Sequence, residues 1–331
     1  MNRIVVVALA LTAATVWGED PQPKKEPHKL PPELKVLRLG LIAKSQSNPV
    51  FQAARVGAVD AAKEWSEKLG IPVEVDWRTP LDEDAQKQAE YLEQLALQGV
   101  RGIAISCSDA NTVTDAINRA VARGIPVVCF DSDARNSKRF CFHGVDDLEC
   151  GRRLMAETAK ALGPAGGDVA ILAGNQNAPN LQKRVAGAKE EAAKHKNIRI
   201  VDVYYHKETP QDGAARVEQV QQANPHIKAW CMVGGWPLFT DVLLKWEPGR
   251  IKIVAVDALP SQLPYVEKGV AQVLMAQHCY NWGHRSIDLL VERIAYGREP
   301  KNPIDTAPLI PVTAENAKEF GKNWEKWLRK L

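Results

Sequence analysis

The chain has 331 residues, which is long enough for two domains of ordinary size. Its apolar fraction of 45% and charged fraction of 25% are those of a soluble globular protein. The 43 basic and 40 acidic residues give a formal net charge of +3, which is too balanced to indicate nucleic acid or an anionic membrane surface as a partner.

Residues 1–18 are predicted to be a secretory signal peptide. A short basic start, MNR, precedes a nearly unbroken apolar run from Ile4 to Trp17, and an acidic pair follows Gly18. The run is too short for a membrane-spanning helix. We expect cleavage after Gly18 and export of a soluble mature chain to the periplasm; an uncleaved anchor is the alternative.

Residues 19–33, EDPQPKKEPHKLPPE, are rich in proline and charge and lack apolar periodicity. This composition predicts a semi-extended spacer outside any core. The folded body is expected to begin near Leu34.

From there a strand followed by a helix repeats along the chain. Residues 36–43, VLRLGLIA, predict a buried strand, and the next segment carries apolar residues at helical spacing: Phe51, Ala54, Ala58, Ala61 and Trp65. Glycines end the predicted helices ahead of new strands, at Gly70, Gly99 and Gly124. Further apolar strands are predicted at 72–77, 100–106, 125–131, 168–174, 198–205, 228–235, 251–257 and 270–277.

Alternating strands and helices indicate parallel sheets with helices on both faces, and the number of units indicates two doubly wound α/β lobes. Ligands of such sheets bind outside the carboxyl ends of the strands. Polar or aromatic residues follow the predicted strand ends at Lys44 to Asn48, Trp77, Ser106, Asp131, Asn175 to Asn177, Trp236, Asp257 and Gln277. Helix capping would explain some of them, but Trp236 and Gln277 are not capping types.

Several short segments in a fixed order carry a family resemblance. They are SNPVF (47–51), GIAISCSDANTV (102–113), GIPVVCFDSD (124–133), VDD (145–147), IKIVAVDALP (251–260) and VLMAQHCYNWG (273–283). Together they resemble the periplasmic sugar-binding proteins of ABC importers, of the ribose-, allose- and galactose-binding type, from about Val36 to Thr313.

The resemblance implies the type I periplasmic binding protein fold, in which two lobes are joined by a three-strand hinge and clamp a sugar between them. The chain would cross between the lobes near 143–147, 276–280 and 305–309. The implied N-terminal lobe is 34–145 plus 278–306, and the implied C-terminal lobe is 146–277 plus 307–331.

The resemblance also implies ligand contacts. The positions that match contacts of the family are Lys44, Asn48, Phe51, Ser106, Asp131, Asp257 and Gln277. Among them, Asp131 and Asp257 match two acids that clamp sugar hydroxyls, one from each lobe, and Phe51 matches an aromatic that packs on the sugar ring. We expect both carboxylates to stay ionised and to face open solvent before the ligand arrives.

Three departures leave the particular sugar open. Ser132 stands where an arginine commonly follows the first acid, and Gln182 occupies the expected position of a second-lobe arginine. Gly234-Gly235 and then Trp236 replace an Asn-Asp pair. A tryptophan adds an apolar face for stacking, so we expect Trp236 and Phe51 to wall the pocket; ordinary packing of Trp236 on a helix face is the alternative.

Other chemistry has little support. The six cysteines and seven histidines show no metal-ligand spacing, and Cys141 with Cys150 is the one pair considered for a disulfide, although buried thiols are favoured. The sequence contains no nucleophile elbow and no phosphate-binding glycine loop. Asp131 and Asp257 could form the carboxylate pair of a glycosidase, but nothing else catalytic accompanies them. We therefore expect neither enzymatic activity nor a cofactor.

The function predicted from the sequence is that of a monomeric receptor that delivers a monosaccharide or similar polyol to an inner-membrane ABC permease. The alternative is a sensor whose ligand-loaded form docks on a membrane kinase or chemoreceptor. A repressor of the related transcription-factor family would need an N-terminal helix-turn-helix, where this chain has its predicted signal peptide.

Overall fold

The structure is a computed structural model that describes residues 28–176 and 178–331. The predicted signal peptide at 1–18 lies outside the described residues, as does most of the spacer predicted at 19–33. Within the described residues, no helix is long and apolar enough to cross a membrane.

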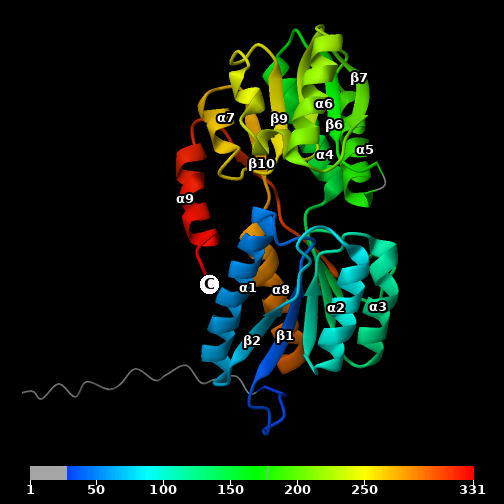
Figure 1. The fold of residues 1–331 in the computed structure, drawn as a ribbon, viewed down its shortest axis with the longest axis vertical. Helices are drawn as coiled ribbons and strands as arrows, with labels where there is room; N and C mark the ends of the chain where they lie inside the picture. Colours follow the sequence, from blue (N-terminus) through cyan, green and yellow to red (C-terminus); the bar gives the residue numbers. More distant parts are fainter. Residues whose placement is uncertain (1–27, 177) are drawn as a thin grey trace, which may run out of the picture.

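The first of two six-stranded sheets, in the lower half of Figure 1, is parallel throughout, in the order β11-β5-β4-β3-β1-β2. Its three central strands β3, β4 and β5 are buried along their whole length because helices cover both faces of the sheet. The strands are β1 (Leu37–Ile42), β2 (Val73–Trp77), β3 (Gly102–Ile105), β4 (Val127–Phe130), β5 (Cys141–Gly144) and β11 (Ile304–Thr306).

The second sheet has the order β12-β10-β9-β8-β6-β7 and is parallel except for β12, which pairs antiparallel with β10. Its strands are β6 (Gly167–Ala173), β7 (Ile198–Tyr205), β8 (Ile227–Met232), β9 (Lys252–Val256), β10 (Val273–Ala276) and β12 (Ile310–Val312). The prediction of two doubly wound lobes with largely parallel sheets is confirmed.

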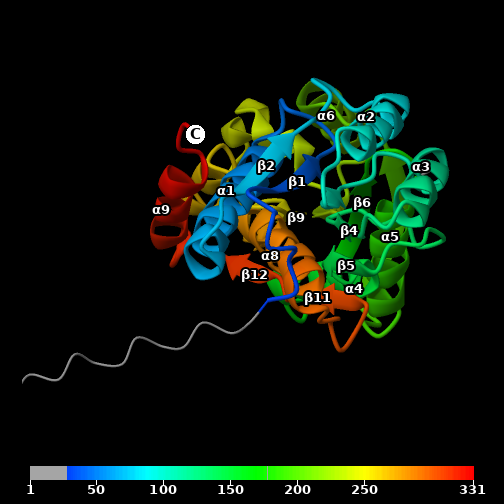
Figure 2. The same cartoon turned by 90° about the horizontal axis from the view of Figure 1, so that it is seen from below.

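Helices cover the faces of both sheets. Those of the first lobe are α1 (Pro49–Leu69), α2 (Ala85–Leu97), α3 (Ala110–Ala122) and α8 (Cys279–Val291), which continues into the π-helical turn η3 (Glu292–Tyr296). In Figure 2, α1 and α8 lie on one side of the first sheet and α2 and α3 on the other. The second lobe carries α4 (Asp147–Leu162), α5 (Pro179–Ala192), α6 (Pro210–Ala223), the 3₁₀ turns η1 (Trp236–Phe239) and η2 (Val242–Lys245), α7 (Leu263–Glu267) and α9 (Ala317–Trp327).

Helix α1 shows how the local sequence determines where a helix begins and ends. Asn48 caps its start by accepting a hydrogen bond from the Val50 amide at 3.1 Å, and Pro49 occupies the first helical position. Gly70 ends the helix with a left-handed φ of 74°. The predicted apolar stripe is buried along the helix. The capped start of α1 therefore lies directly after β1, at the carboxyl edge of the sheet.

Glycines allow the main helix pair of each lobe to pack backbone against backbone. In the first lobe, a Cβ on Gly57 would collide with the Tyr280 carbonyl oxygen, and one on Gly283 with that of Ala54. In the second lobe, a Cβ on Gly151 of α4 or on Gly187 of α5 would likewise collide with a backbone carbonyl oxygen of the other helix. In both lobes, therefore, glycines allow close backbone contact between the two helices of the main pair.

The chain passes between the lobes three times, between β5 and α4, between β10 and α8, and between β11 and β12. The crossings are joined to each other: the Ala307 amide donates to the Gly144 carbonyl at 2.8 Å, and His278 Nε2 lies 2.9 Å from the Pro308 carbonyl. After the third crossing, α9 lies alongside both lobes, as Figure 1 shows in red.

All six cysteines lie in the described part of the chain, and each is a free, buried thiol. Cys141 belongs to β5 and Cys150 to α4, and the disulfide considered between them is absent from the structure.

Candidate ligand-binding site

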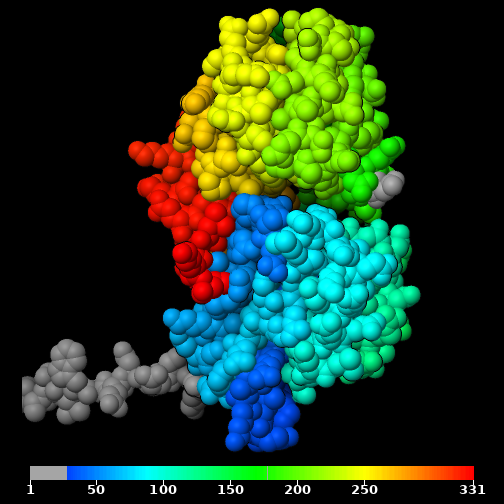
Figure 3. Space-filling model, viewed as in Figure 1, coloured from blue at the N-terminus to red at the C-terminus, as the bar shows by residue number. Residues whose placement is uncertain are grey.

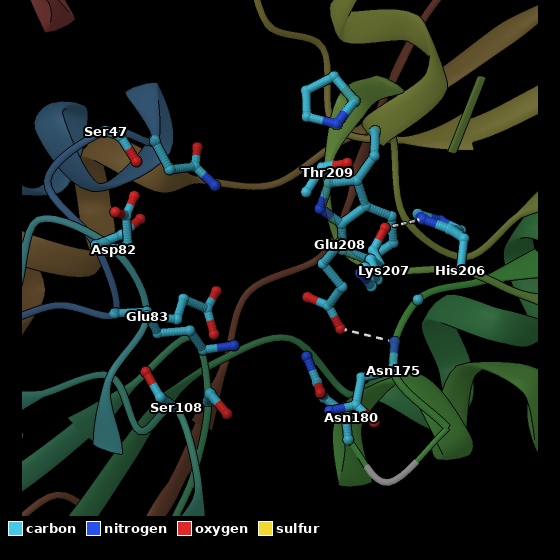
Figure 4. A pocket seen from close by; sticks show the side chains of 18 of the residues that line it. Ser47, Asp82, Glu83, Ser108, Asn175, Asn180, His206, Lys207, Glu208 and Thr209 are labelled. Atoms are coloured by element: carbon cyan, nitrogen blue, oxygen red, sulfur yellow. Dashed lines mark hydrogen bonds between the residues drawn. The ribbon is translucent and has the colours of Figure 1, made fainter. Parts of the chain in front are cut away.

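A cleft of about 1200 Å³ lies between the lobes, where the carboxyl ends of both sheets meet. One wall comes from the segments that follow β1 to β4 and the other from those that follow β6 to β9. In Figure 4, Asp82, Glu83 and Ser108 of the first wall face Asn180 and Glu208 of the second across open space. The space-filling view shows the lobes meeting along a seam, with α9 at one end of it (Figure 3).

Lys44 lines the first wall and forms a cluster with Ser106 and Asp131, which lie behind the wall and are not among the described residues that line the cleft. The Ser106 hydroxyl donates to Asp131 Oδ2 at 2.7 Å, and Lys44 Nζ lies 3.8 Å from the same oxygen. Burial favours the neutral amine of Lys44, but the Asp131, Glu83 and Glu208 carboxylates outweigh it, so the pKa of Lys44 is raised. The lysine therefore remains a cation inside the cleft.

Behind the second wall, Asp257 and Gln277 are paired, and neither is among the described residues that line the cleft. Gln277 Nε2 donates to Asp257 Oδ1 at 2.8 Å. Burial raises the pKa of Asp257, and the hydrogen bond from Gln277 and the nearby Arg184 guanidinium offset only part of that effect. Gln277 itself lies on the second crossing between the lobes, immediately after β10.

Asp131 and Asp257 occupy equivalent places, each directly after an inner strand of its sheet. Their φ angles are 57° and 69°, and they are the non-glycine residues with positive φ in the described ranges. Such a conformation costs an L-residue of order 1–2 kcal/mol. Held strain of this kind concentrates at functional sites, so the backbone supports the view that both carboxylates belong to the site.

Arg184 is a central residue that the sequence reasoning missed. From α5, its buried guanidinium donates to Asp147 Oδ1 at 2.9 Å, to the Val233 carbonyl at 3.2 Å and to Gln277 Oε1 at 3.3 Å. Desolvation disfavours its charge, but the Cys150, Asp147, Asp257 and Asp131 side chains outweigh it and raise the pKa of Arg184. The guanidinium is thus held as a cation whose charge interacts with both Asp131 and Asp257.

Gln182, expected in the place of a second-lobe arginine, is exposed, and its amide donates to the Gln176 carbonyl. It lies outside the set of described residues that line the cleft. The helical spacing could have identified Arg184, because it shares the buried face of α5 with Leu181, Val185 and Ala188. A charged residue on an apolar face points to an internal ionic role.

Of the two aromatic residues expected to line the pocket, Trp236 lines the cleft and Phe51 does not. Trp236 lines the cleft at the start of η1, and its ring meets the His206 imidazole edge to face at a centroid distance of 5.2 Å. Phe51 is 3% exposed, packs in the core at 6.3 Å from the Trp282 ring, and is not among the described residues that line the cleft. Asn48 lines the cleft while capping α1.

Two further lining residues offer polar atoms to a ligand. Ser108 Oγ and His206 Nε2 are buried and have no hydrogen-bond partner among residues 28–176 and 178–331. Burial lowers the pKa of His206, which keeps the imidazole neutral at physiological pH, and Nδ1 donates to the Lys207 carbonyl. Nε2 is therefore a hydrogen-bond acceptor.

These groups suit a small polyhydroxy ligand. The lining carboxylates of Glu83 and Glu208 and the His206 Nε2 atom can accept hydrogen bonds from hydroxyls, while the lining Lys44 can donate to them. The Trp236 ring offers an apolar face for C–H groups. Within the described ranges, no three His, Cys, Asp or Glu side chains are grouped so that they could hold a metal ion.

Comparisons with known proteins agree with this geometry. Residues 39–299 match the periplasmic binding protein domain family. The chain is 27% identical over 285 residues to the D-allose-binding periplasmic protein of Escherichia coli (strain K12), covering 81% of this chain and 87% of that protein. It is 25% identical over 295 residues to the D-apiose import binding protein of Actinobacillus succinogenes, covering 86% and 90%. An ABC transporter solute-binding protein from Burkholderia graminis, solved with D-arabinose, superposes with a TM-score of 0.78 at 28% identity, covering 85% of this chain and 96% of that one.

Proposed function

The chain belongs to the periplasmic binding protein domain family, and on that premise we propose that it is an exported receptor for a monosaccharide or similar polyol. It acts without catalysis or cofactor, and as a monomer it presents its closed, loaded form to an inner-membrane ABC permease. The relatives named for D-allose and D-apiose, and the neighbour solved with D-arabinose, support a sugar as the ligand. The apolar run from Ile4 to Trp17 supports export.

The pair Asp131 and Asp257 carries the proposal. The two carboxylates directly follow equivalent strands of opposite lobes in the same strained backbone conformation, and the Arg184 cation interacts electrostatically with both. A sugar that donates hydroxyls to both carboxylates bridges the lobes, and each charge-assisted hydrogen bond contributes roughly 1.5–3 kcal/mol. Because about 1.4 kcal/mol is a factor of ten in affinity, either carboxylate alone holds the ligand weakly.

The alternative role is that of a sensor that docks on a membrane kinase or chemoreceptor. It uses the same closed lobes and the same sugar contacts. The D-apiose relative is an import binding protein, which favours delivery to a permease.

A ligand screen by thermal shift tests the proposal. The purified mature chain is melted with monosaccharides, polyols, nucleosides and autoinducer-type furanoses. A true ligand at 100 times its dissociation constant adds about 2.7 kcal/mol to stability. We expect one or a few related sugars to raise the melting temperature, and calorimetric titration then to give their affinities.

The same titration with Asp131→Ala checks the site. Loss of its charge-assisted bonds should weaken binding roughly ten- to a hundredfold. Asp202→Ala, an exposed position on the edge strand β7, is the matched control and should bind like the parent. A shift with nucleosides alone, or full affinity in Asp131→Ala, contradicts the proposal.

A further inference from the structure

Helix α9 contacts both lobes, although the connectivity makes it part of the second. It follows β12, the strand after the third crossing, and it lies beyond residues 39–299, which match the family. Figure 1 shows it running from α7 of the second lobe toward α1 of the first.

The second lobe holds α9 through buried contacts. Trp324 is 4% exposed, and its indole Nε1 donates to the Ala258 carbonyl at 2.8 Å. Phe320 is buried on the same face, and Gly321 packs close to Leu263 of α7. The helix therefore moves with the second lobe.

Residues at the end of α9, and Arg329 just beyond it, reach the first lobe. The Trp327 ring stacks on the Tyr280 ring of α8, with centroids 6.1 Å apart and planes at 17°, and Lys326 Nζ lies 5.2 Å from the centre of the Tyr280 ring. Arg329 forms an ion pair with Asp60 of α1, and the Tyr280 hydroxyl donates to the same carboxylate at 2.7 Å. These side chains link the lobes independently of the three chain crossings.

The Asp60 carboxylate is ionised in this arrangement. Partial burial disfavours the charge, but the hydrogen bonds from Tyr280 and Arg329 outweigh it, and the pKa of Asp60 lies below its ordinary value. The Asp60–Arg329 contact is therefore a charged pair at neutral pH.

We propose that α9 is a strap that limits how far the two lobes open in the ligand-free protein. Its anchor at Ala258 adjoins Leu259 and Ser261, which line the cleft, so the strap runs along the flank of the cleft. When the cleft widens, the end of α9 moves away from Tyr280 and Asp60 and these contacts break. Each contact is modest, but all of them act on the same rigid-body motion.

The strap has a consequence for binding. A receptor that is rarely wide open spends more of its time near the binding-competent arrangement, and apparent affinity scales with that fraction. The inference depends on the two lobes and their hinge, and it holds whatever ligand occupies the cleft.

The test uses ligand-free protein, so that its failure is distinguishable from failure of the sugar proposal. Small-angle scattering compares the parent with Arg329→Gln and with Trp327→Leu, both of which leave Trp324 and its anchor intact. We expect both variants to have a larger radius of gyration than the parent. Lys322→Gln is the control on the same helix, because Lys322 pairs with Glu319 of α9 itself.

A second variant pair guards against indirect effects. Asp60→Asn removes the same ion pair from the first lobe and should enlarge the radius of gyration as Arg329→Gln does, while the double variant should add little to either. Circular dichroism establishes that each variant is folded. Radii equal to the parent in all folded variants would overturn the proposal, and so would an equal increase in Lys322→Gln.

Discussion

Asp131 and Asp257 share a left-handed backbone, and Asp131 is buried while Asp257 is half-buried. We expected both carboxylates to face open solvent before the ligand arrives, and the structure differs. Asp131 is 7% exposed and already engages Ser106 and Lys44, while burial raises the pKa of Asp257. Part of the desolvation cost of binding is therefore met when the protein folds.

The raised pKa of Asp257 predicts a conflict between binding and stability. A folded-state pKa above the unfolded value, near 3.9 for aspartate, means that the folded protein holds the proton more tightly. Stability therefore falls as the pH rises from the unfolded-state pKa through the folded-state pKa. Deprotonation of Asp257 in the folded protein therefore lowers its stability relative to the protonated form. Asp257→Asn should be at least as stable as the parent at pH 7, with the difference shrinking toward pH 3.5, and should bind sugar about tenfold more weakly or worse.

Thermal unfolding at several pH values, with calorimetric titration of the sugar found by screening, measures both effects. Asp202→Asn is the control, because Asp202 is an exposed carboxylate of the same lobe. A marked loss of stability in Asp257→Asn at pH 7 would show that the carboxylate stabilises the fold after all.

The positions of candidate site residues at strand ends could be predicted from the sequence, whereas that of Arg184 on a helix was missed. Lys44, Ser106, Asp131, Asp257 and Gln277 each lie at or near the end of a strand, and parallel strands bring such ends to one edge. The orientation of a helical side chain depends on where the helix starts. Helix α5 begins after an alanine, which has no capping side chain to mark its start, and its register was misjudged by two residues.

At the scale of elements, the long periodic segments were predicted and the short ones were not. Helix α1 and the buried central strands follow from apolar spacing and from glycine stops. The turns η1, η2 and η3 span four or five residues, too few to show a period. Strands β11 and β12 span three residues each and pair through tertiary contacts.

The glycine contacts between α1 and α8 make a prediction at this scale. In Gly283→Ala the new methyl collides with the Ala54 carbonyl, a backbone atom that moves only with its helix. Overpacking of this kind costs about 1–3 kcal/mol. We expect a lower urea midpoint for the unfolding of the first lobe.

Gly321→Ala is the matched control for that substitution. Its Cβ meets Leu263 Cδ1 at 3.0 Å, the end of a flexible side chain that can turn away. We expect a change within about 0.5 kcal/mol, as for a tolerated site. Equal effects of the two substitutions would mean that backbone contact between α1 and α8 is not what makes Gly283 necessary.

At the scale of the whole molecule, three joined crossings and a cleft between rigid lobes predict hinge closure. The crossings bond to one another, so the lobes rotate about them together. A ligand that contacts Asp131 and Asp257 at once draws the lobes together. Small-angle scattering at saturating sugar should show a smaller radius of gyration than without it, and an unchanged radius would contradict closure.

The buried cysteines make this molecule ready for conversion into an optical reporter. Thiol reagents need an accessible thiolate, whereas burial raises the pKa of Cys141 to about 11 and those of Cys150 and Cys231 to about 12. A Ser47→Cys substitution would add one thiol at an exposed residue on the rim of the cleft. A polarity-sensitive dye coupled there would change its emission when the opposite wall approaches, so the native cysteines could stay in place while the protein measures sugar in solution.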